Sequence, residues 1–385
     1  MNSGCRDLRA RVILFGLATA VTFSSADAAQ FRVLHSFTGG NDGARPEFAL
    51  LADSSGNLYG TTSQGGGTGC TVGCGVIYKI APDGTETILH AFTGGSDGAD
   101  PNGPLVSDAS GNLYGTTGAY ADGYSGTVFK VSPGGVLTTL HSFTKEPDGV
   151  QPLGGVILDG SGNLYGTTYY GGTEGYGTVY RIAPDGIETI LHSFDPQKGE
   201  GGEPFKSLLR DPKGNFYGIA GAPGEIYKVD KKGALTVLYT FRQGDENGSF
   251  PAAALIRDKL GNLYGTTTED GSYDYGTAYK LAPDGTMSVL YSFDGGKCGG
   301  DPVAGLLADK QGNFYGETTT TGDEVTGAIF RLGADGTMKR LHRFTGREDG
   351  GDPTGGLISG PQGLLYGVAS LGGSKDEGTV FAVSK

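Results

Sequence analysis

The sequence predicts an all-β protein, a seven-bladed β-propeller with four strands in each blade. Three observations support this fold: a phrase that recurs seven times, four strand-like runs in every repeat, and chain ends that complement one another. The phrase Gly-Asn-(Leu/Phe)-Tyr-Gly occurs six times, and Gly-Leu-Leu-Tyr-Gly at 363–367 is a seventh copy. Repeats of about 51 residues therefore fill residues 29–385, and such a period is typical of propellers and solenoids.

Each repeat contains four short runs that are rich in β-branched and aromatic residues, as strands are. The first run follows a repeated proline, as at 302–309, and the second is the Asn-Leu-Tyr-Gly-Thr-Thr phrase. Residues 177–182 and 189–194 exemplify the third and fourth runs. Asp-Gly, Gly-Asn and Pro-Asp-Gly sequences separate the runs and favour tight turns, because Gly and Asn tolerate positive φ. No segment has a helical period.

The two ends of the chain favour a closed ring. Residues 32–37 resemble a fourth strand with no first three, and residues 378–383 resemble a third strand with no fourth. We therefore expect the N-terminal strand to complete the last blade. The alternative is an open β-solenoid, which would leave two exposed sheet edges.

Residues 1–28 are predicted to be a secretory signal peptide. Arg6, Arg9 and Arg11 precede an apolar run at 12–23 that is too short to span a bilayer, and Ala26-Asp27-Ala28 fits a cleavage site. The alternative is an uncleaved N-terminal anchor. We expect a secreted protein, periplasmic or extracellular, with no membrane span after cleavage, which acts as a monomer.

The composition excludes several classes of function. The chain has 29 basic and 42 acidic residues, a net charge of −13 and no basic run, so it is a poor candidate for binding nucleic acid or anionic membranes. Four cysteines cannot build a disulfide-framework miniprotein or a Cys-rich metal site. Hydrophobic residues make up 37% of the chain, which is enough for a core despite 73 glycines.

The repeat unit Pro-x-x-x-Leu-x-x-Asp-x-x-Gly-Asn-Leu-Tyr-Gly-Thr-Thr, followed by Gly-Thr-Val-Phe-Lys and Leu-His-Ser-Phe, resembles a known family. It is similar to the GloVer-type tandem repeat of secreted bacterial choice-of-anchor proteins, and the likeness covers residues 31–385. The resemblance implies export and a repeat architecture. It implies no activity and no catalytic residue.

The five histidines occupy one position, the second residue of Leu-His-x-Phe in the fourth strand, where two repeats carry Tyr239 and Tyr291. One histidine per blade on an outer strand leaves no converging partners, so we interpret them as structural. This argues against a catalytic triad and against a His-ligated metal. The histidines are His35, His90, His141, His192 and His342.

Seven tyrosines lie outside the repeated positions, and all fall in the loop between the second and third strands. Aromatic side chains in loops on a rigid scaffold can form a binding surface, and tyrosine suits sugar rings. The alternative is that they pack over Gly-rich turns. The candidate ligand-binding residues are Tyr120, Tyr124, Tyr169, Tyr170, Tyr176, Tyr273 and Tyr275.

The loop before each proline carries a repeated acidic position, which we expect on the same face as the tyrosines. It could bind Ca²⁺ or attract cationic ligands, or it could only hold an Asp-Gly turn, as the occurrence in most repeats favours. The weak metal candidates are Asp42, Asp97, Asp148 and Asp349. No other cofactor is predicted.

The first strands should line a central channel with small residues. Lys206 is the charged exception, and Glu47 neighbours the equivalent position in blade 1. Lys206 is a candidate base or ligand clamp, or a lysine that reaches solvent at the channel mouth. Cys70 and Cys74 are placed for a local disulfide, and the remaining Cys298 suggests a buried thiol or an intermolecular bond.

We predict from the sequence that the protein binds a glycan, another extracellular polymer or a surface protein through its Tyr- and Asp-rich loops. Two alternatives stay open. One is an extracellular polysaccharide lyase or hydrolase acting on the same face, and the other is a purely structural envelope protein. Propellers carry many functions, so the fold does not choose among these.

Overall fold

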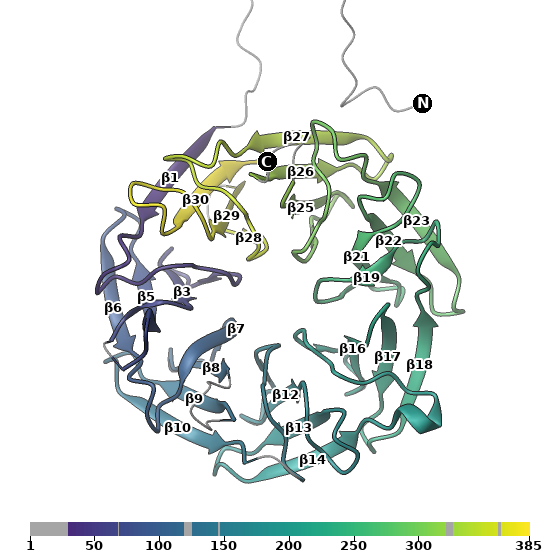
Figure 1. Cartoon of the computed structure of the whole chain (residues 1–385), viewed down its shortest axis with the longest axis horizontal. Helices are drawn as coiled ribbons and strands as arrows, with labels where there is room; N and C mark the ends of the chain where they lie inside the picture. Colours follow the sequence, from purple (N-terminus) through teal and green to yellow (C-terminus); the bar gives the residue numbers. More distant parts are fainter. Residues whose placement is uncertain (1–29, 68, 119–124, 145–146, 321–325, 361–362) are drawn as a thin grey trace, which may run out of the picture.

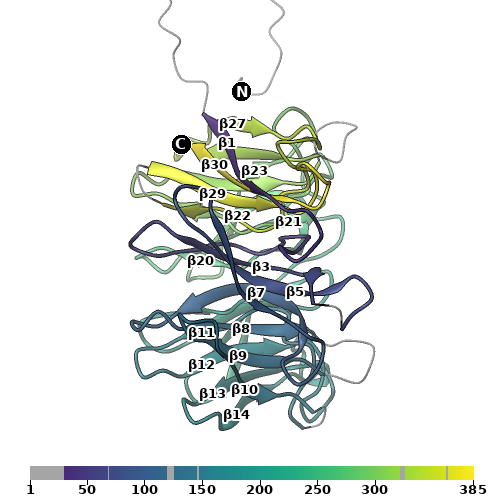
Figure 2. The same ribbon diagram turned by 90° about the vertical axis from the view of Figure 1, so that its left-hand side faces the viewer.

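Seven four-stranded antiparallel sheets surround a central axis in the computed structural model, which describes residues 30–385 apart from 68, 119–124, 145–146, 321–325 and 361–362. Figure 1 shows the sheets arranged as blades of a ring, and Figure 2 shows the ring edge-on. The predicted seven-bladed β-propeller is confirmed. Blades 1 to 7 are numbered in chain order.

The second and third strands of each blade form its centre. The second strands are β3 (Leu58–Thr62), β8 (Leu113–Gly118), β12 (Leu164–Thr168), β16 (Phe216–Ala220), β21 (Leu263–Glu269), β25 (Phe314–Thr318) and β29 (Leu364–Ala369). The third strands are β5 (Gly73–Ile80), β9 (Thr127–Val131), β13 (Thr178–Ile182), β17 (Glu225–Val229), β22 (Thr277–Leu281), β26 (Ala328–Leu332) and β30 (Thr379–Ser384).

The fourth strands form the outer rim. They are β6 (Glu86–Ala91), β10 (Leu137–Ser142), β14 (Glu188–Ser193), β18 (Leu235–Thr240), β23 (Met287–Ser292), β27 (Met338–Arg343) and, for blade 7, β1 (Phe31–Ser36). Two small elements lie outside this plan: β4 (Gly65–Gly66) pairs in parallel with β5, and η1 (Pro196–Lys198) is a 3-10 turn.

The N-terminal strand closes the ring, as predicted. β1 pairs antiparallel with β30, from Phe31 opposite Val383 to Ser36 opposite Thr379. Strands β1 and β30 thus share blade 7, as Figure 1 shows. The predicted signal peptide lies outside the described residues. Among the residues that are described, no helix has the length and apolar character needed to cross a membrane.

The innermost strands are shorter than the sequence predicts. They are β2 (Leu51–Ala52), β7 (Ala99–Ser107), β11 (Ile157–Leu158), β15 (Leu209–Arg210), β19 (Ser249–Pro251) with β20 (Ile256–Arg257), β24 (Leu307–Ala308) and β28 (Ile358–Ser359). Outside blades 2 and 5, the run after the proline pairs only through its last two residues. Proline has no N–H to donate, and the residue before it has a positive φ in every blade, so even in blades 2 and 5 the pairing skips that residue.

The hydrophobic core lies between the blades. At each of the seven junctions, the phenylalanine of a fourth strand packs against the aromatic ring of the next blade's third strand, with centroids 5.1–5.4 Å apart. The same third-strand ring lies over the glycine of the Tyr-Gly phrase. A Cβ at Gly115 would sit 2.6 Å from Phe129 Cζ, so the repeated glycine is required by packing.

A second contact joins consecutive blades. In six blades a glycine at or just before the start of the third strand packs on the proline of the next blade; a Cβ at Gly177 would lie 2.8 Å from Pro204 Cδ. At this junction the Glu203 N–H donates to the carbonyl oxygen of Tyr176 at 2.8 Å. Four other junctions repeat this hydrogen bond from the residue before the proline, and Arg45 to Glu377 (2.9 Å) makes it between blades 1 and 7.

The repeated tyrosine of the second strand is structural. In six blades its hydroxyl donates to the aspartate six residues earlier, at 3.0–3.2 Å. The same aspartate accepts backbone N–H groups of its own turn, such as Asp159 from Ser161 and Asn163. Each hydrogen-bonded set therefore holds the hairpin between the first and second strands.

Removing residues 31–37 should destabilise the ring, because it uncovers the edge of β30 and deletes Phe37, which is fully buried. We expect the free energy of unfolding to fall by roughly 5 kcal/mol or more, given typical costs for buried phenylalanine alone. Thermal unfolding of chains starting at residue 29 and residue 38 measures this. Equal melting temperatures would contradict closure by β1.

Candidate functional site

An axial cavity of about 660 Å³ opens at the centre of the ring and is lined by residues from all seven blades. As predicted, the lining comes from the positions two and three residues past each proline. Small residues are required there because neighbouring blades nearly touch: a Cβ at Gly103 would lie 2.5 Å from Gly155 Cα. The cavity is therefore a fixed consequence of the repeat, and its chemistry depends on the exceptions to the small residues.

Lys206 is the only cationic side chain among the described residues that line the cavity. It is half-buried, its Nζ lies 5.7 Å from the Phe205 ring centroid, and burial lowers the pKa of its ammonium group. Glu47 and Asp352 line the same cavity. Burial raises the pKa of Glu47, and the nearby carboxylates of Asp100 and Asp352 raise it further. Acidic and basic groups thus share one partly desolvated space.

The residue before each proline has a left-handed backbone, with φ between +52° and +59°. This strained conformation recurs in all seven blades, and the side chains differ from blade to blade. They are Arg45, Asp100, Gln151, Glu203, Phe250, Asp301 and Asp352. Burial raises the pKa values of Asp100 and Asp301. We call these seven residues the mouth ring.

The loops that carry the tyrosines and the mouth ring share one face of the propeller, as predicted. Isolated bridges pair the two loops within single blades, for example Val150 with Tyr170 and Gly300 with Thr320. We call this the loop face. Four of its tyrosines are 39–51% exposed: Tyr170, Tyr176, Tyr273 and Tyr275. The predicted residues Tyr120 and Tyr124 lie outside the described residues.

The described tyrosines form two groups on the loop face. At the junction of blades 3 and 4, the Tyr169 hydroxyl donates to Glu203 Oε2 at 3.0 Å, and Tyr169 and Tyr170 meet edge to face at 4.5 Å. Burial and the Glu203 carboxylate raise the pKa of Tyr169 to about 12, so its hydroxyl stays a donor. Tyr169 is therefore fixed, whereas Tyr170 is 42% exposed.

At the junction of blades 5 and 6, the ring of Tyr275 lies against Gly295 and Gly300, where a Cβ would come within 2.6–2.8 Å. The ring of Tyr176 covers Gly202 in the same way at the other junction. Tyr176 and Tyr275 thus do pack over glycine turns, which was the alternative explanation for the loop tyrosines. Each still keeps 39% or more of its surface exposed.

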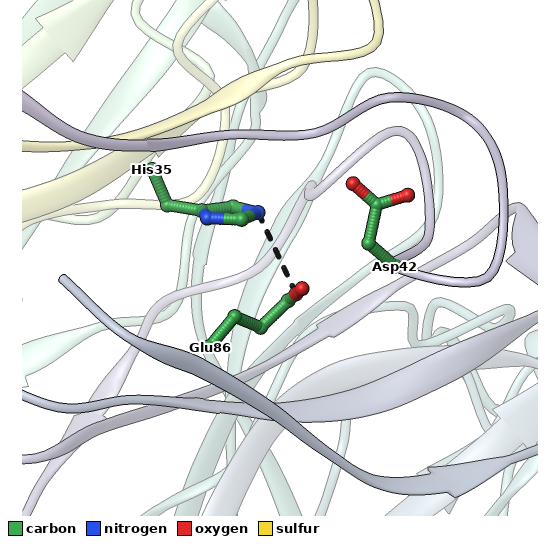
Figure 3. Close-up of side chains that lie close together, drawn as sticks. All are labelled: His35, Asp42 and Glu86. Atoms are coloured by element: carbon green, nitrogen blue, oxygen red, sulfur yellow. Dashed lines mark ion pairs between the residues drawn. The ribbon is translucent and has the colours of Figure 1, made fainter.

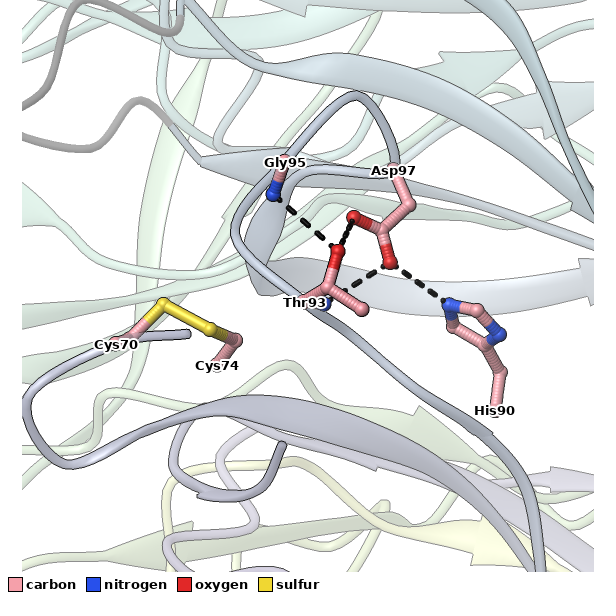
Figure 4. Close-up of a disulfide and its surroundings, with 6 residues drawn as sticks. All are labelled: Cys70, Cys74, His90, Thr93, Gly95 and Asp97. Atoms are coloured by element: carbon pink, nitrogen blue, oxygen red, sulfur yellow. Dashed lines mark hydrogen bonds and ion pairs between the residues drawn. A yellow bond between two sulfur atoms is a disulfide. The ribbon is translucent and has the colours of Figure 1, made fainter. Parts of the chain in front are cut away.

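The histidines orient the acidic loops at the outer rim. In four of them Nε2 lies 2.9–3.1 Å from a carboxylate oxygen: His90 to Asp97, His141 to Asp148, His192 to Glu200 and His342 to Asp349. Figure 4 shows the first of these pairs, with Asp97 also bonded to Thr93. The histidines take the structural role that the sequence suggested in these blades.

The four aspartates proposed as weak Ca²⁺ candidates each accept the backbone N–H of a threonine four residues earlier, at 2.8–3.1 Å. Each carboxylate is used within its own turn, so the four do not gather into one site. They are Asp42, Asp97, Asp148 and Asp349.

The expectation that histidines have no converging partners is wrong at two junctions. His35, Asp42 and Glu86 form one cluster, and the equivalent residues His141, Asp148 and Glu188 form another, with ligand atoms within 4.8 Å of one another. The sequence argument missed Glu86 and Glu188, which come from the outer strand of the following blade.

Glu317 is a further residue that the sequence argument missed. It stands where four other blades have the first threonine of Gly-Thr-Thr, is fully buried, and accepts the N–H of the channel residue Gly356 at 2.8 Å through Oε2. Its Oε1 has no hydrogen-bond partner, and burial raises the pKa of Glu317 to about 8. The replacement of threonine by glutamate in the repeated phrase was the sequence signal that could have identified this residue.

Cys70 and Cys74 form a disulfide in the loop of blade 1, drawn in Figure 4. It closes a five-residue loop next to β4 and fixes one segment of the loop face. Cys298 is fully buried in the core beside Phe293.

The seven blades and the cavity along their common axis define this protein as a seven-bladed β-propeller. The chain belongs to the Gloeobacter/Verrucomicrobia repeat family, which matches residues 15–225 and 220–385. The resemblance seen in the repeated phrase is thereby confirmed. No curated protein matches the sequence.

Solved structures of similar fold include virginiamycin B lyase from Staphylococcus aureus, in a catalytically inactive variant with quinupristin. It has a TM-score of 0.63 at 12% identity, covering 93% of this chain and 99% of that one. Another is an extracellular domain assigned to a hybrid two component system of B. thetaiotaomicron, with a TM-score of 0.57 at 14% identity over 92% of this chain and 41% of that one. At these identities the likeness concerns the fold.

Glu317→Gln should flatten the dependence of stability on pH. The folded-state pKa of about 8 exceeds the unfolded value of 4.5, so the contribution of Glu317 is full below pH 4.5 and is lost as the pH rises through 8. Glutamine keeps the shape without the ionisation. We expect the substitution to raise the free energy of unfolding by on the order of a few kcal/mol at about pH 9 and to change it little near pH 4. Thermal unfolding at both pH values measures this difference. An equal effect at both pH values would contradict this.

Proposed function

We propose that this protein is a secreted binding protein whose loop face recognises a glycan or another extracellular polymer. The observation that carries the proposal is the group of four half-exposed tyrosines, which share one face with the mouth of the axial cavity. Aromatic side chains on a rigid frame bind with little loss of conformational freedom, because the scaffold already orders them.

Tyrosine supports a sugar ligand for a physical reason. Its flat ring can stack on the apolar face of a pyranose, and its hydroxyl can exchange hydrogen bonds with sugar hydroxyls. Tyr170 is 42% exposed and its ring lies at 80° to that of its neighbour Tyr169, with the centroids 4.5 Å apart. Tyr273, which is 51% exposed, presents a second aromatic surface.

The charges of the loop face narrow the class of polymer. Four of the seven mouth-ring residues are acidic, and the whole chain carries a net charge of −13. A polymer rich in carboxylates or sulfates would be repelled. The proposal therefore favours neutral or amino-sugar polymers over uronic acid polymers.

The second candidate is an extracellular polysaccharide lyase or hydrolase acting in the axial cavity. Lys206 and Glu47 line that cavity together, and burial shifts their pKa values toward the neutral forms. The Lys206 amine of blade 4 is the candidate base, and the Glu47 carboxyl group of blade 1 is the candidate acid.

The double variant Tyr170→Ala/Tyr176→Ala should weaken binding to the recognised polymer about tenfold or more, because it removes two exposed aromatic surfaces from one junction. Co-elution with neutral, amino-sugar and uronic acid polymers identifies the polymer, and titration gives the affinity. The matched control is Leu260→Ala, which removes an 82% exposed side chain from the hairpin on the opposite face. Equal losses in both variants would contradict the site.

Lys206→Met and Glu47→Gln distinguish the enzyme from the binding protein. If the polymer is cleaved by the wild type, each variant should lower the rate at least about a hundredfold while binding persists. Chromatography of the polymer before and after incubation measures cleavage. An intact polymer that co-elutes with the protein supports the binding role. If no polymer interacts with the protein, a protein partner or a structural role becomes the favoured hypothesis.

A further inference from the structure

The clearest departure from the repeat at the outer rim is a glutamate that faces a histidine across a blade junction. The first residue of each fourth strand lies at this position. It is apolar in five blades: Phe31, Leu137, Leu235, Met287 and Met338. It is glutamate in two, Glu86 and Glu188. The apolar version is seen where Phe31 stacks on His342 with centroids 3.7 Å apart.

In the first cluster, a histidine nitrogen and a glutamate oxygen face one another without a hydrogen bond. His35 Nε2 lies 3.6 Å from Glu86 Oε1, and both atoms are closed off from solvent with no hydrogen-bond partner. Figure 3 shows the imidazole and the two carboxylates converging from β1, β6 and the loop that holds Asp42. Of the five histidines, His35 alone has an Nε2 without a hydrogen bond.

The second cluster repeats the arrangement between blades 2 and 3. His141 Nε2 lies 3.1 Å from Asp148 Oδ1 and 4.0 Å from Glu188 Oε2, and Glu188 Oε1 is buried without a partner. The same three residue types therefore meet at a second blade junction.

Each cluster brings together more negative charge than its surroundings balance. Two carboxylates face a histidine at each junction: Asp42 and Glu86 at the first, and Asp148 and Glu188 at the second. Among the described residues, no ion pair joins any of these carboxylates to a Lys or an Arg.

We propose that each cluster binds one divalent transition metal ion between adjacent blades, through His35, Asp42 and Glu86 at one junction and through His141, Asp148 and Glu188 at the other. One imidazole nitrogen and two carboxylates suit Zn²⁺, and a fourth position is left for water. Ca²⁺ prefers an all-oxygen shell, so the imidazole disfavours it.

The metal at the first junction would join the closing strand to the rest of the ring. His35 lies on β1, which completes blade 7, and Glu86 lies on β6 of blade 1. An ion that binds only the folded ring stabilises it by mass action, so Zn²⁺ should raise the melting temperature. This inference concerns the rim and does not depend on the proposed polymer site.

Zn²⁺ titration of the untagged chain starting at residue 29, by calorimetry and by metal analysis after dialysis, tests the proposal. We expect two Zn²⁺ per chain for the wild type, one for Glu86→Gln and none for Glu86→Gln/Glu188→Gln. The matched control is His90→Gln. His90 is equivalent to His35 and His141, but the residue opposite it in the next blade is Leu137 instead of a glutamate, so this variant should still bind two Zn²⁺ per chain. Circular dichroism checks that each variant folds.

A gain of binding provides a second test that loss of folding cannot mimic. Leu137→Glu places a carboxylate beside His90 and Asp97, and should raise the count to three. Zn²⁺ binding that persists in the double glutamine variant, equal loss in His90→Gln, or binding of Ca²⁺ without Zn²⁺ would each overturn the proposal. Absence of Zn²⁺ binding in the folded wild type would overturn it outright.

Discussion

The contact between the proline of one blade and the glycine of the preceding blade is the constraint on which the rest of the structure depends. It brings consecutive blades so close that Gly177 cannot carry a Cβ against Pro204. It also fixes the residue before the proline, whose N–H must reach the preceding blade, in a left-handed conformation that costs about 1–3 kcal/mol. The strain is tolerated because the interlocking aromatic rings at every junction stabilise the same geometry.

This contact between blades distinguishes the residues that hold the scaffold from those that are available for a functional site. Residues that make the junction recur in every repeat, whereas side chains that the junction does not use are free to differ. The mouth ring is the clearest case, since its backbone is the same in all seven blades and its side chains range from Arg45 to Phe250. Lys206, Glu317 and Glu86 are departures of the same kind. In a repeat protein, residues that depart from the repeated pattern without disturbing the fold are the candidates for specific chemistry.

The sequence was sufficient for the propeller, its closure by the first strand, the small residues at the axis and the shared face of the tyrosine loops, because each follows from local pattern and repetition. It was not sufficient for the short innermost strands. Their length depends on the left-handed backbone of the residue before each proline, and the residue types at that position do not predict this conformation. The His35–Asp42–Glu86 cluster was missed for another reason. Its members come from two blades, and only the rotation between blades brings Glu86 to His35. Glu317 could have been found by aligning the repeats, but its burial could not.

Hydrogen–deuterium exchange with and without the polymer that the protein recognises is the most direct test of the central claim, that the loop face is the functional surface. We expect protection of residues 169–176 and 271–276 and of the innermost segment around Lys206, with no change in the hairpins of the opposite face, such as the one at 258–262. Protection confined to those hairpins, or to the outer strands, would contradict the account.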